Sequence, residues 1–282
     1  MNAAQLAIAL KAVRSGRQWK CKCVAHEDRS PSMLIFDGRS AVQVRCLAGC
    51  DQRDLIAELK RRGLWEAGAN ERCQAVATNA SHETIMRDRA RSLFDQSVLC
   101  HGTLAQRYLE SREIWSVARD IEDIRFHENC PREDHRVQAI VVAMRHVRSR
   151  SIHAVQRIYL DRDGRKDGKP MMLGPVRDCA MMLGEPGDEL HIAEGLETAL
   201  SVMAMDYAPA WAMGSCGAIE RFAVLDGIGH LQIWADHDDP GLKAASACER
   251  RWTDEGHSAA VLCPLQEGAD FADVWRKRCA RP

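Results

Sequence analysis

Two short acidic stretches of this 282-residue chain hold the residue types best suited to catalysis: HIAEGLETAL at 191–200 and LQIWADHDDPG at 231–241. In each, apolar residues typical of a buried strand run into carboxylates and then into a helix start. Parallel strands end at one edge of a sheet, which is where open α/β folds bind their ligands. We therefore expect Glu194, Asp236 and Asp238 to meet there and to hold Mg²⁺ or Mn²⁺, which prefer oxygen ligands.

The local geometry of the second stretch divides its acids between two roles. Side chains two apart in an extended segment point the same way, so Asp236 and Asp238 are predicted to share the ion while His237 points away. Asp239 is predicted to cap the following helix, with Pro240 at its first position. The carboxylate of Glu194 is interpreted as either a metal ligand or a general base, and the sequence leaves both open.

A different metal chemistry is predicted near the N-terminus, in WKCKCVAHEDRSPSMLIFDGRSAVQVRCLAGC at 19–50. The candidate ligands form two close pairs, Cys23 with His26 and Cys46 with Cys50. Four soft or borderline ligands arranged in this way suit a closed, structural Zn²⁺ site. The span between the pairs fits two strands, SMLIF and AVQVR, joined by a turn at Asp37-Gly38. A module this small buries little core of its own, so we expect it to fold only with its metal.

Composition is that of an ordinary soluble chain: 46% of the residues are hydrophobic, 28% are charged and the net charge is -1. Because the chain is not basic overall, a nucleic-acid role requires a local patch. The apolar run from Leu6 to Leu10 is interrupted by Lys11 and Arg14, and no cleavage site follows, so no secretion is expected. Twelve cysteines in such a chain favour the cytoplasm and metal binding. No stretch predicts a membrane span.

The elements that must position these residues follow from apolar spacing. Helices are predicted over 3–13 and 51–64, the second capped by Asp51, and helical spacing returns over 82–116. Residues 66–81 lack sustained periodicity and are predicted to be a linker. From 188 onward the strand candidates LHIA, PAWAM, LQIW and SAAVLC alternate with helical stretches, and this alternation predicts a parallel sheet covered by helices.

The middle of the chain carries the local positive charge. Between residues 132 and 177, eleven Lys or Arg residues stand against five Asp or Glu residues, around the strand candidates VQAIVVAM and SIHAVQRIYL. A phosphate-rich partner requires such a surplus. Arg157, Lys166 and Lys169 are the residues we expect to contact nucleotide or template phosphates.

The cysteine-rich stretch resembles the zinc-binding domain of bacterial and phage primases, whose CPxHxxxxPS opening appears here as CVAHEDRSPS. Val24 replaces the usual Pro, and three residues rather than two separate the second pair of cysteines. Cys21 is a competing thiol, but Cys23 keeps the family's spacing to His26. The resemblance implies recognition of a single-stranded template. The candidate contacts are Arg29, Arg39 and Arg45, with Trp19 and Phe36 as stacking surfaces.

A strand, Glu-Gly and helix, followed about forty residues later by a strand and Asp-x-Asp, resembles the Toprim domain of primases, topoisomerases and some nucleases. EGLETA is similar to the EGYATA-type motif of primases carried by phages and conjugative plasmids. Leu196 and Glu197 depart from that motif, and Glu197 is interpreted as a further ligand or as a first-turn acid. QRIYLDRDGRKDGKPMMLGPV resembles the basic half of the primase core, and Asp270 and Asp273 resemble a terminal acidic element.

Together these resemblances imply an α/β protein of the DNA primase class, a nucleotidyltransferase. The expected organisation is a zinc ribbon-like domain at 1–66, a linker at 67–81, a mixed α+β basic half at 82–187 and a Toprim domain at 188–282. The implied ligands are a single-stranded DNA template, nucleoside triphosphates, structural Zn²⁺ and catalytic Mg²⁺ or Mn²⁺. Because no GxxxxGK[ST] motif is present, a separate helicase or replication initiator is the expected protein partner.

Two other classes use the same features. A metal-dependent nuclease of Toprim type would cleave phosphodiesters at the acidic edge. A non-catalytic zinc and Toprim protein of recombination would bind DNA without needing a complete set of carboxylates. The presence of Glu194, Asp236 and Asp238 favours catalysis over binding alone.

Overall fold

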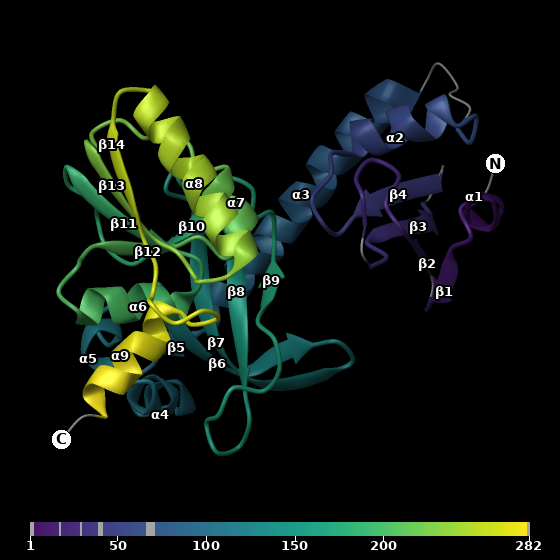
Figure 1. The fold of residues 1–282 in the computed structure, drawn as a ribbon. Helices are drawn as coiled ribbons and strands as arrows, with labels where there is room; N and C mark the ends of the chain where they lie inside the picture. Colours follow the sequence, from purple (N-terminus) through teal and green to yellow (C-terminus); the bar gives the residue numbers. More distant parts are fainter. Residues whose placement is uncertain (1–2, 17, 29, 39–41, 66–70, 281–282) are drawn as a thin grey trace. The chain divides into compact units, whose positions relative to one another are not determined.

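A computed structural model of the chain describes residues 3–16, 18–28, 30–38, 42–65 and 71–280, with the backbone alone for 71–81 (Figure 1). The chain separates into two compact units, Met1–Thr78 and Asn79–Pro282. Among the described helices, none has the length and apolar character needed to cross a membrane.

The N-terminal unit is a four-stranded sheet packed with two helices. Its elements are α1 (Ala3–Ala9), β1 (Val13–Ser15), β2 (Gln18–Cys21), β3 (Met33–Asp37), β4 (Val42–Cys46) and α2 (Gln52–Arg61). The strands follow the order β1-β2-β3-β4, and every neighbouring pair is antiparallel. Both helices and the middle strands supply its fully buried core, which includes Leu6, Met33, Ile35, Leu55 and Leu59.

The sequence predicted two of these strands and the second helix. SMLIF and AVQVR correspond to β3 and β4, and Asp51 caps α2 by accepting a hydrogen bond from the Arg53 N–H at 2.8 Å. The predicted helix over 3–13 is shorter, because Lys11 adopts a φ of 50° and the chain turns there into β1. The strands β1 and β2 were not predicted.

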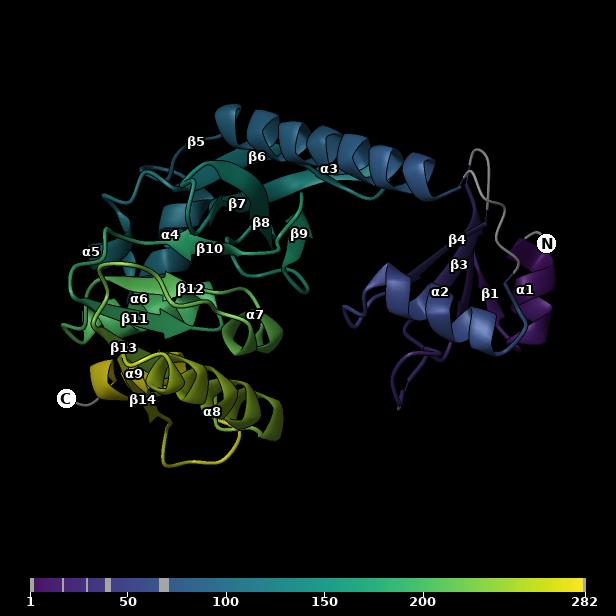
Figure 2. The same ribbon diagram turned by 90° about the horizontal axis from the view of Figure 1, so that it is seen from above.

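The C-terminal unit begins with elements of the basic half. These are α3 (Glu71–Asp95), β5 (Val98–Leu99), α4 (Leu104–Ser111), α5 (Trp115–Ala118), β6 (Ile124–Arg132), β7 (His135–His146), β8 (Ile152–Leu160), β9 (Met171–Leu173) and β10 (Cys179–Met182). Long antiparallel pairs join β6 to β7 and β7 to β8. Helix α3 lies along these strands (Figure 2), where Ala90, Leu93 and Phe94 pack against residues of all three.

Helix α3 begins at Glu71, so the backbone of residues 71–81, predicted to be a linker, is helical. Ala, Glu, Gln and Arg in this stretch favour a helix through their intrinsic propensity. A search for apolar periodicity misses such a segment, because propensity requires no repeating apolar face.

The rest of the C-terminal unit forms the parallel half of the same ten-stranded sheet. Its elements are β11 (Glu189–Ala193), α6 (Leu196–Ala204), β12 (Ala210–Ala212), α7 (Cys216–Glu220), β13 (His230–Trp234), α8 (Asp239–Asp254), β14 (Ser258–Leu262) and α9 (Phe271–Cys279). The strand order β14-β13-β11-β12 is parallel throughout, and β12 joins the antiparallel half through β10. The predicted α/β class and the parallel sheet are confirmed.

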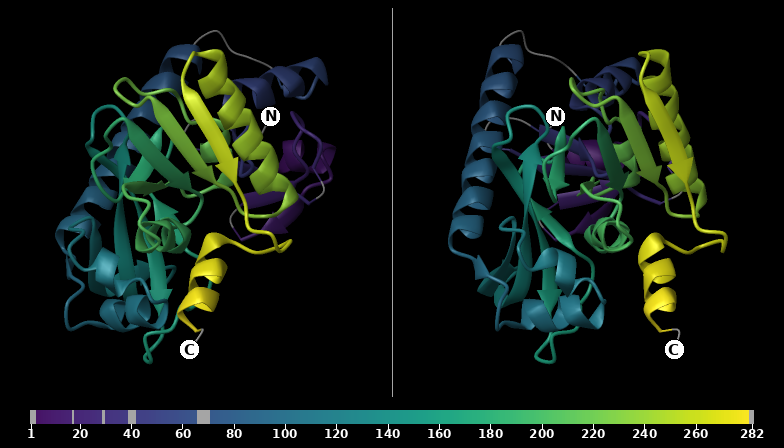
Figure 3. Two further views of the ribbon diagram at one scale, coloured as in Figure 1. Left: turned by 60° about the vertical axis from the view of Figure 1, so that its left-hand side comes forward. Right: turned by 90° about the vertical axis from the view of Figure 1, so that its left-hand side faces the viewer.

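Helices cover both faces of this parallel half (Figure 3). On one face, α7 and α8 pack against the strands through Ile219, Cys248 and Trp252. On the other face, α6 and α9 do so through Leu200 and Phe271. Strands β11, β12 and β13 are mostly buried between these helices, so the edge where the strands end is the place for a ligand site.

Candidate functional site

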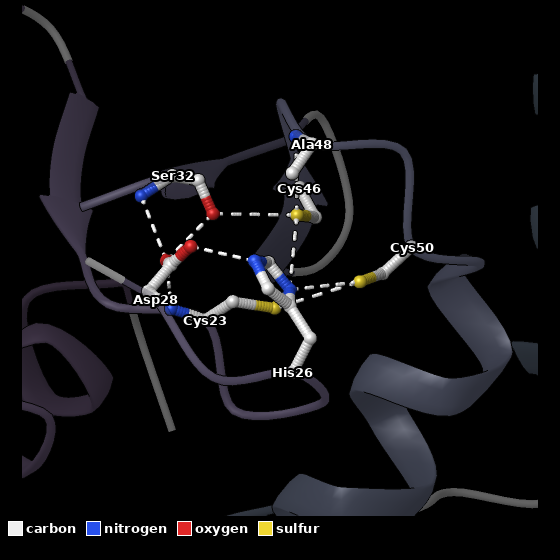
Figure 4. A network of polar contacts seen from close by, with 7 residues as sticks. All are labelled: Cys23, His26, Asp28, Ser32, Cys46, Ala48 and Cys50. Atoms are coloured by element: carbon white, nitrogen blue, oxygen red, sulfur yellow. Dashed lines mark hydrogen bonds and ion pairs between the residues drawn. The ribbon is translucent and has the colours of Figure 1, made fainter. Parts of the chain in front are cut away.

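The N-terminal unit gathers its predicted zinc ligands into one cluster (Figure 4). Cys23 and His26 lie in the turn after β2, Cys46 ends β4, and Cys50 lies just before α2. Their ligand atoms all lie within 4.8 Å of one another. The antiparallel pairing of β2, β3 and β4 therefore brings together two residue pairs that are far apart in sequence.

The spacing within the cluster matches a tetrahedral zinc site. Two sulfur ligands at the usual Zn–S distance of ~2.3 Å are about 3.8 Å apart. Here the Cys23 and Cys50 sulfurs are 3.9 Å apart, and the His26 Nδ1 lies 3.9 Å from the Cys46 sulfur and 3.0 Å from that of Cys50. Soft and borderline atoms at these separations fit Zn²⁺ as a closed structural site.

Two cysteine thiols of this unit, Cys46 inside the cluster and Cys21 outside it, differ in their environment. Burial raises the pKa of Cys46, but hydrogen-bond donors around its sulfur, which include the backbone N–H groups of Cys50 and Ala48, bring it down to about 7. Thiolate is the form that binds metal, so these donors prepare the ligand. Cys21 is buried outside the cluster, and burial raises its pKa to about 11. Cys23, and not Cys21, thus belongs to the cluster.

In the C-terminal unit, the predicted acidic residues follow two adjacent parallel strands. Glu194 follows β11 and Asp236 follows β13, and the two strands pair in register up to Ala193 and Trp234. Besides burial, the negative charges of Glu194 and Asp238 raise the pKa of Asp236, and the charge of Asp238 raises the pKa of Glu194. The carboxyl ends of neighbouring strands thus concentrate negative charge at one place.

Asp236 is the centre of this acidic edge. Burial and repulsion from Glu194, Asp270, Asp238 and Asp273 raise its pKa to about 7. Its Oδ1 atom is buried and has no hydrogen-bond partner within the described structure. A buried carboxylate oxygen without a partner is costly, and a bound cation would remove that cost.

The structure also brings the terminal acids to this edge. Asp270 caps α9 by accepting a hydrogen bond from the Asp273 N–H at 2.7 Å. The loop before α9 is held against the acidic loop, since the His237 N–H donates to the Ala269 carbonyl and the Gly268 N–H donates to the His237 carbonyl. The His237 ring hydrogen-bonds the carbonyl of Pro264.

The N-cap of α8 was predicted one residue too late. Asp238, not Asp239, caps α8, and its Oδ1 accepts a hydrogen bond from the Gly241 N–H at 2.7 Å. A side chain at 241 would meet the Asp236 carbonyl at 2.7 Å, so the turn admits only glycine. Capping occupies one oxygen of Asp238 and leaves its second oxygen for a cation.

The acidic edge fits a hard divalent cation in its chemistry, because every donor is a carboxylate and one donor oxygen is buried without a partner. Glu194 is held there by a hydrogen bond from the Cys216 backbone N–H. Among the described residues, however, the cysteine and histidine cluster is the only group of three or more candidate ligand atoms close enough to one another to hold a metal ion, and the carboxylates of the acidic edge form no such group.

The predicted phosphate-binding residues have unlike environments. Arg157 is buried, and its guanidinium donates to the backbone carbonyls of Pro131 in β6 at 2.9 Å and Met172 in β9 at 3.2 Å, which joins β8 to these two strands. Lys166 is paired with Glu197 at 3.1 Å. Lys169 is exposed and makes no ion pair within the described chain.

Glu197 is a polar centre whose partners the sequence did not reveal. Its carboxylate accepts hydrogen bonds from Tyr108 of α4, from Arg112 at the C-cap of that helix, and from Lys166. Burial alone would raise its pKa, but these donors lower it. The i, i+4 spacing of Tyr108 and Arg112, which places them on one helix face, was the available signal.

The other predicted template contacts lie in the N-terminal unit. Arg45 is exposed, while Trp19 and Phe36 are half-buried on the small sheet. Arg29 and Arg39 lie outside the described residues.

Comparison with known families identifies the C-terminal part of the chain. Residues 189–281 match the family model described as a Toprim domain, and residues 85–187 match a domain of unknown function, DUF7146. The chain therefore contains a Toprim domain that follows the basic half. The comparison with curated proteins gave no match.

Several solved primase structures are similar to this chain. A DnaG primase catalytic domain bound to single-stranded DNA matches with a TM-score of 0.50 and 16% identity, over 70% of this chain and 76% of that one. The Aquifex aeolicus primase, with its zinc-binding and RNA polymerase domains, matches with a TM-score of 0.47 and 13% identity, over 98% of this chain and 80% of that one. The E. coli primase catalytic core gives 0.46 and 15%, over 69% and 75%. The chain has a primase-like fold.

Proposed function

We propose that this protein is a DNA primase that synthesises short RNA primers on single-stranded DNA. The observation that carries the proposal is the acidic edge of the Toprim domain, where the partnerless Oδ1 of Asp236 lies amid other carboxylates. A hard cation would neutralise such an edge, and templated nucleotidyl transfer is a reaction that needs one. The fold shared with a DnaG catalytic domain supports this choice over other Toprim chemistries.

In the proposed reaction, a 3′-hydroxyl attacks the α-phosphate of a nucleoside triphosphate in line. A new P–O bond forms, the bond to the leaving pyrophosphate breaks, and the hydroxyl proton passes to solvent or to a carboxylate. Glu194, Asp236 and the free oxygen of Asp238 would hold Mg²⁺ or Mn²⁺. When bound, such an ion lowers the pKa of the attacking hydroxyl and stabilises charge on the leaving group.

The basic half supplies the proposed phosphate contacts. Lys169 is exposed, and Lys166 lies at the protein surface beside Glu197, so both can reach a nucleotide or template phosphate. Arg157 serves the fold, because its guanidinium is buried against backbone carbonyls. The zinc unit would recognise the single-stranded template, and a separate helicase or replication initiator would deliver it.

The test uses the full chain with single-stranded DNA, labelled ribonucleotides and Mg²⁺ or Mn²⁺. Primase activity gives labelled oligomers that depend on template and metal. A parallel reaction without nucleotides and with labelled DNA detects a nuclease, and a filter-binding measurement detects binding alone. Either cleavage without synthesis or binding without either reaction would overturn the proposal.

Matched variants connect the activity to the acidic edge. Asp236→Asn keeps the side-chain shape and removes the charge, so we expect primer synthesis to fall by at least about a thousandfold, as for loss of a catalytic group. Asp254→Asn removes an exposed acid at the far end of α8 and should leave synthesis unchanged. Circular dichroism would establish that both variants are folded. Synthesis retained by folded Asp236→Asn would exclude the proposed role.

A further inference from the structure

Asp28 lies beside the zinc cluster without belonging to it (Figure 4). Its side chain is only 6% exposed, although it sits in the turn between two ligand-bearing segments. One of its oxygens lies 2.6 Å from the Nε2 of His26. The other accepts hydrogen bonds from the Cys23 N–H at 2.6 Å, the Ser32 N–H at 3.1 Å and the Ser32 hydroxyl at 2.6 Å. The carboxylate is therefore surrounded by donors.

This arrangement decides which nitrogen of His26 is free. A neutral imidazole carries one N–H, and a metal ligand must be the nitrogen without it. A carboxylate only accepts, so the nitrogen that contacts Asp28, Nε2, is the one that carries the hydrogen. The lone pair is then on Nδ1, which is the atom that faces the sulfurs of Cys46 and Cys50.

We propose that Asp28 is a positioning residue for the zinc site: it selects Nδ1 of His26 as the zinc-binding atom and fixes the ring. Carboxylates that hold the second nitrogen of a ligating histidine increase metal affinity in this way. The inference concerns the zinc site alone and does not depend on the proposed enzymatic activity.

Asp28 also links the two pairs of ligands. On one side it holds the Cys23 backbone and the His26 ring. On the other side it accepts the single hydroxyl proton of Ser32, whose oxygen lies 3.4 Å from the Cys46 sulfur. The Ala48 N–H also contacts that sulfur, at 3.3 Å. One buried carboxylate thus contacts both ligand-bearing turns.

The first test compares zinc affinities of full-length variants by chelator competition. Asp28→Asn must direct an NH₂ group at hydrogen-bond donors, so we expect zinc binding to weaken about 10- to 100-fold. Glu27→Gln removes the same charge from the exposed neighbouring residue and should bind zinc like the original chain. Equal affinity of Asp28→Asn and Glu27→Gln would overturn the proposal.

A second measurement does not rely on a variant that folds. In the ¹⁵N-histidine-labelled original chain loaded with Zn²⁺, NMR identifies which ring nitrogen of His26 carries a hydrogen. We expect a protonated Nε2 and a metal-bound Nδ1. A metal-bound Nε2 would refute the selection of Nδ1, whatever the affinities of the variants.

Discussion

The two candidate metal sites differ in how completely the protein prepares them. In the N-terminal unit, four ligand atoms lie within 4.8 Å of one another, and Asp28 and Ser32 hold the ligand turns. At the acidic edge the carboxylates repel one another, and the pKa of Asp236 rises to about 7. The difference follows from chemistry. Neutral thiols and imidazole can be packed together without an ion, whereas carboxylates cannot, unless they take up protons or a cation.

Removal of a predicted zinc ligand should have the largest effect on metal binding and folding. Cys46→Ser should weaken zinc binding on the order of a hundredfold or more and unfold the N-terminal unit, since metal binding in so small a module is coupled to folding. Metal analysis and limited proteolysis would measure both effects. We expect the Asn79–Pro282 unit to stay protease-resistant, because it has its own core.

Cys21→Ser is the matched control for that experiment. Cys21 is equally buried in the same unit but lies outside the cluster, so its replacement should leave one zinc per chain. If Cys21→Ser lost zinc while Cys46→Ser kept it, the ligand assignment would be wrong.

The C-terminal unit should instead become more stable when a carboxylate of the acidic edge is replaced by a neutral side chain. Because the folded-state pKa of Asp236 is about 7, above the ordinary value of 3.8, the unfolding free energy falls as pH rises from the lower value to the higher, and the folded protein releases the proton near the higher value. At about 1.4 kcal/mol for each pKa unit, the charged form costs on the order of 2 to 4 kcal/mol. Without divalent cations, Asp236→Asn should therefore be more stable than the original chain at pH 8, and the difference should vanish near pH 4.

Thermal unfolding at the two pH values, with and without Mg²⁺, would test this expectation. Mg²⁺ should raise the Tm of the original chain at pH 8 and raise that of Asp236→Asn much less. Asp254→Asn, which removes an exposed acid at the far end of the helix that follows the acidic loop, should respond to Mg²⁺ like the original chain. A lower Tm for Asp236→Asn than for the original chain at pH 8 without cations would show that the charged carboxylate does not destabilise the folded protein.

Sequence reasoning succeeded where the determinants are local. The clustering of Cys23, His26, Cys46 and Cys50 was predictable because two close pairs flank a hairpin. The positions of Glu194 and Asp236 after two parallel strands were predictable because strand and helix patterns alternate there. The predicted N-cap of α8 was wrong by one residue, since either Asp238 or Asp239 satisfies the same capping pattern. The burial of Arg157 was not predictable, because a surplus of local charge does not show which face of a strand is covered.

Long-range partners were the other limit. Glu197 was recognised as a departure from the motif, but its partners Tyr108 and Arg112 lie 89 and 85 residues away. No local pattern connects α4 with α6. The carboxylate there has a lowered pKa, in contrast to Asp236, because cations and a hydroxyl surround it.

Glu197→Gln would sharpen the contrast between the two carboxylates. The neutral amide loses the charge and directs its NH₂ group at donors, so the C-terminal unit should lose about 1–3 kcal/mol of unfolding free energy at pH 7. Since the folded-state pKa of Glu197 is lowered, its carboxylate stabilises the original chain fully above the unfolded-state pKa. This contribution disappears as pH falls through the folded-state pKa, and the difference between the variant and the original chain should disappear with it. Urea unfolding at pH 7 and at low pH would measure it.

Glu220→Gln provides the control, because this exposed acid contributes only its backbone carbonyl to a hydrogen bond. A loss of stability that is equal in the two variants, or that persists at low pH, would contradict the role given to Glu197.

The smallest expected effect concerns phosphate binding. Lys169 is exposed and unpaired in the described chain, whereas Arg157 is enclosed by backbone carbonyls. If Lys169 contacts one phosphate, Lys169→Ala should weaken single-strand binding only a few-fold and reduce the slope of log affinity against log salt by about 0.7 to 1. Arg157→Lys should leave that slope unchanged and lower the Tm instead, since it removes hydrogen bonds that join strands. A reduced salt slope for Arg157→Lys with an unchanged Tm would reverse the two assignments, because only a residue that meets phosphate releases counterions.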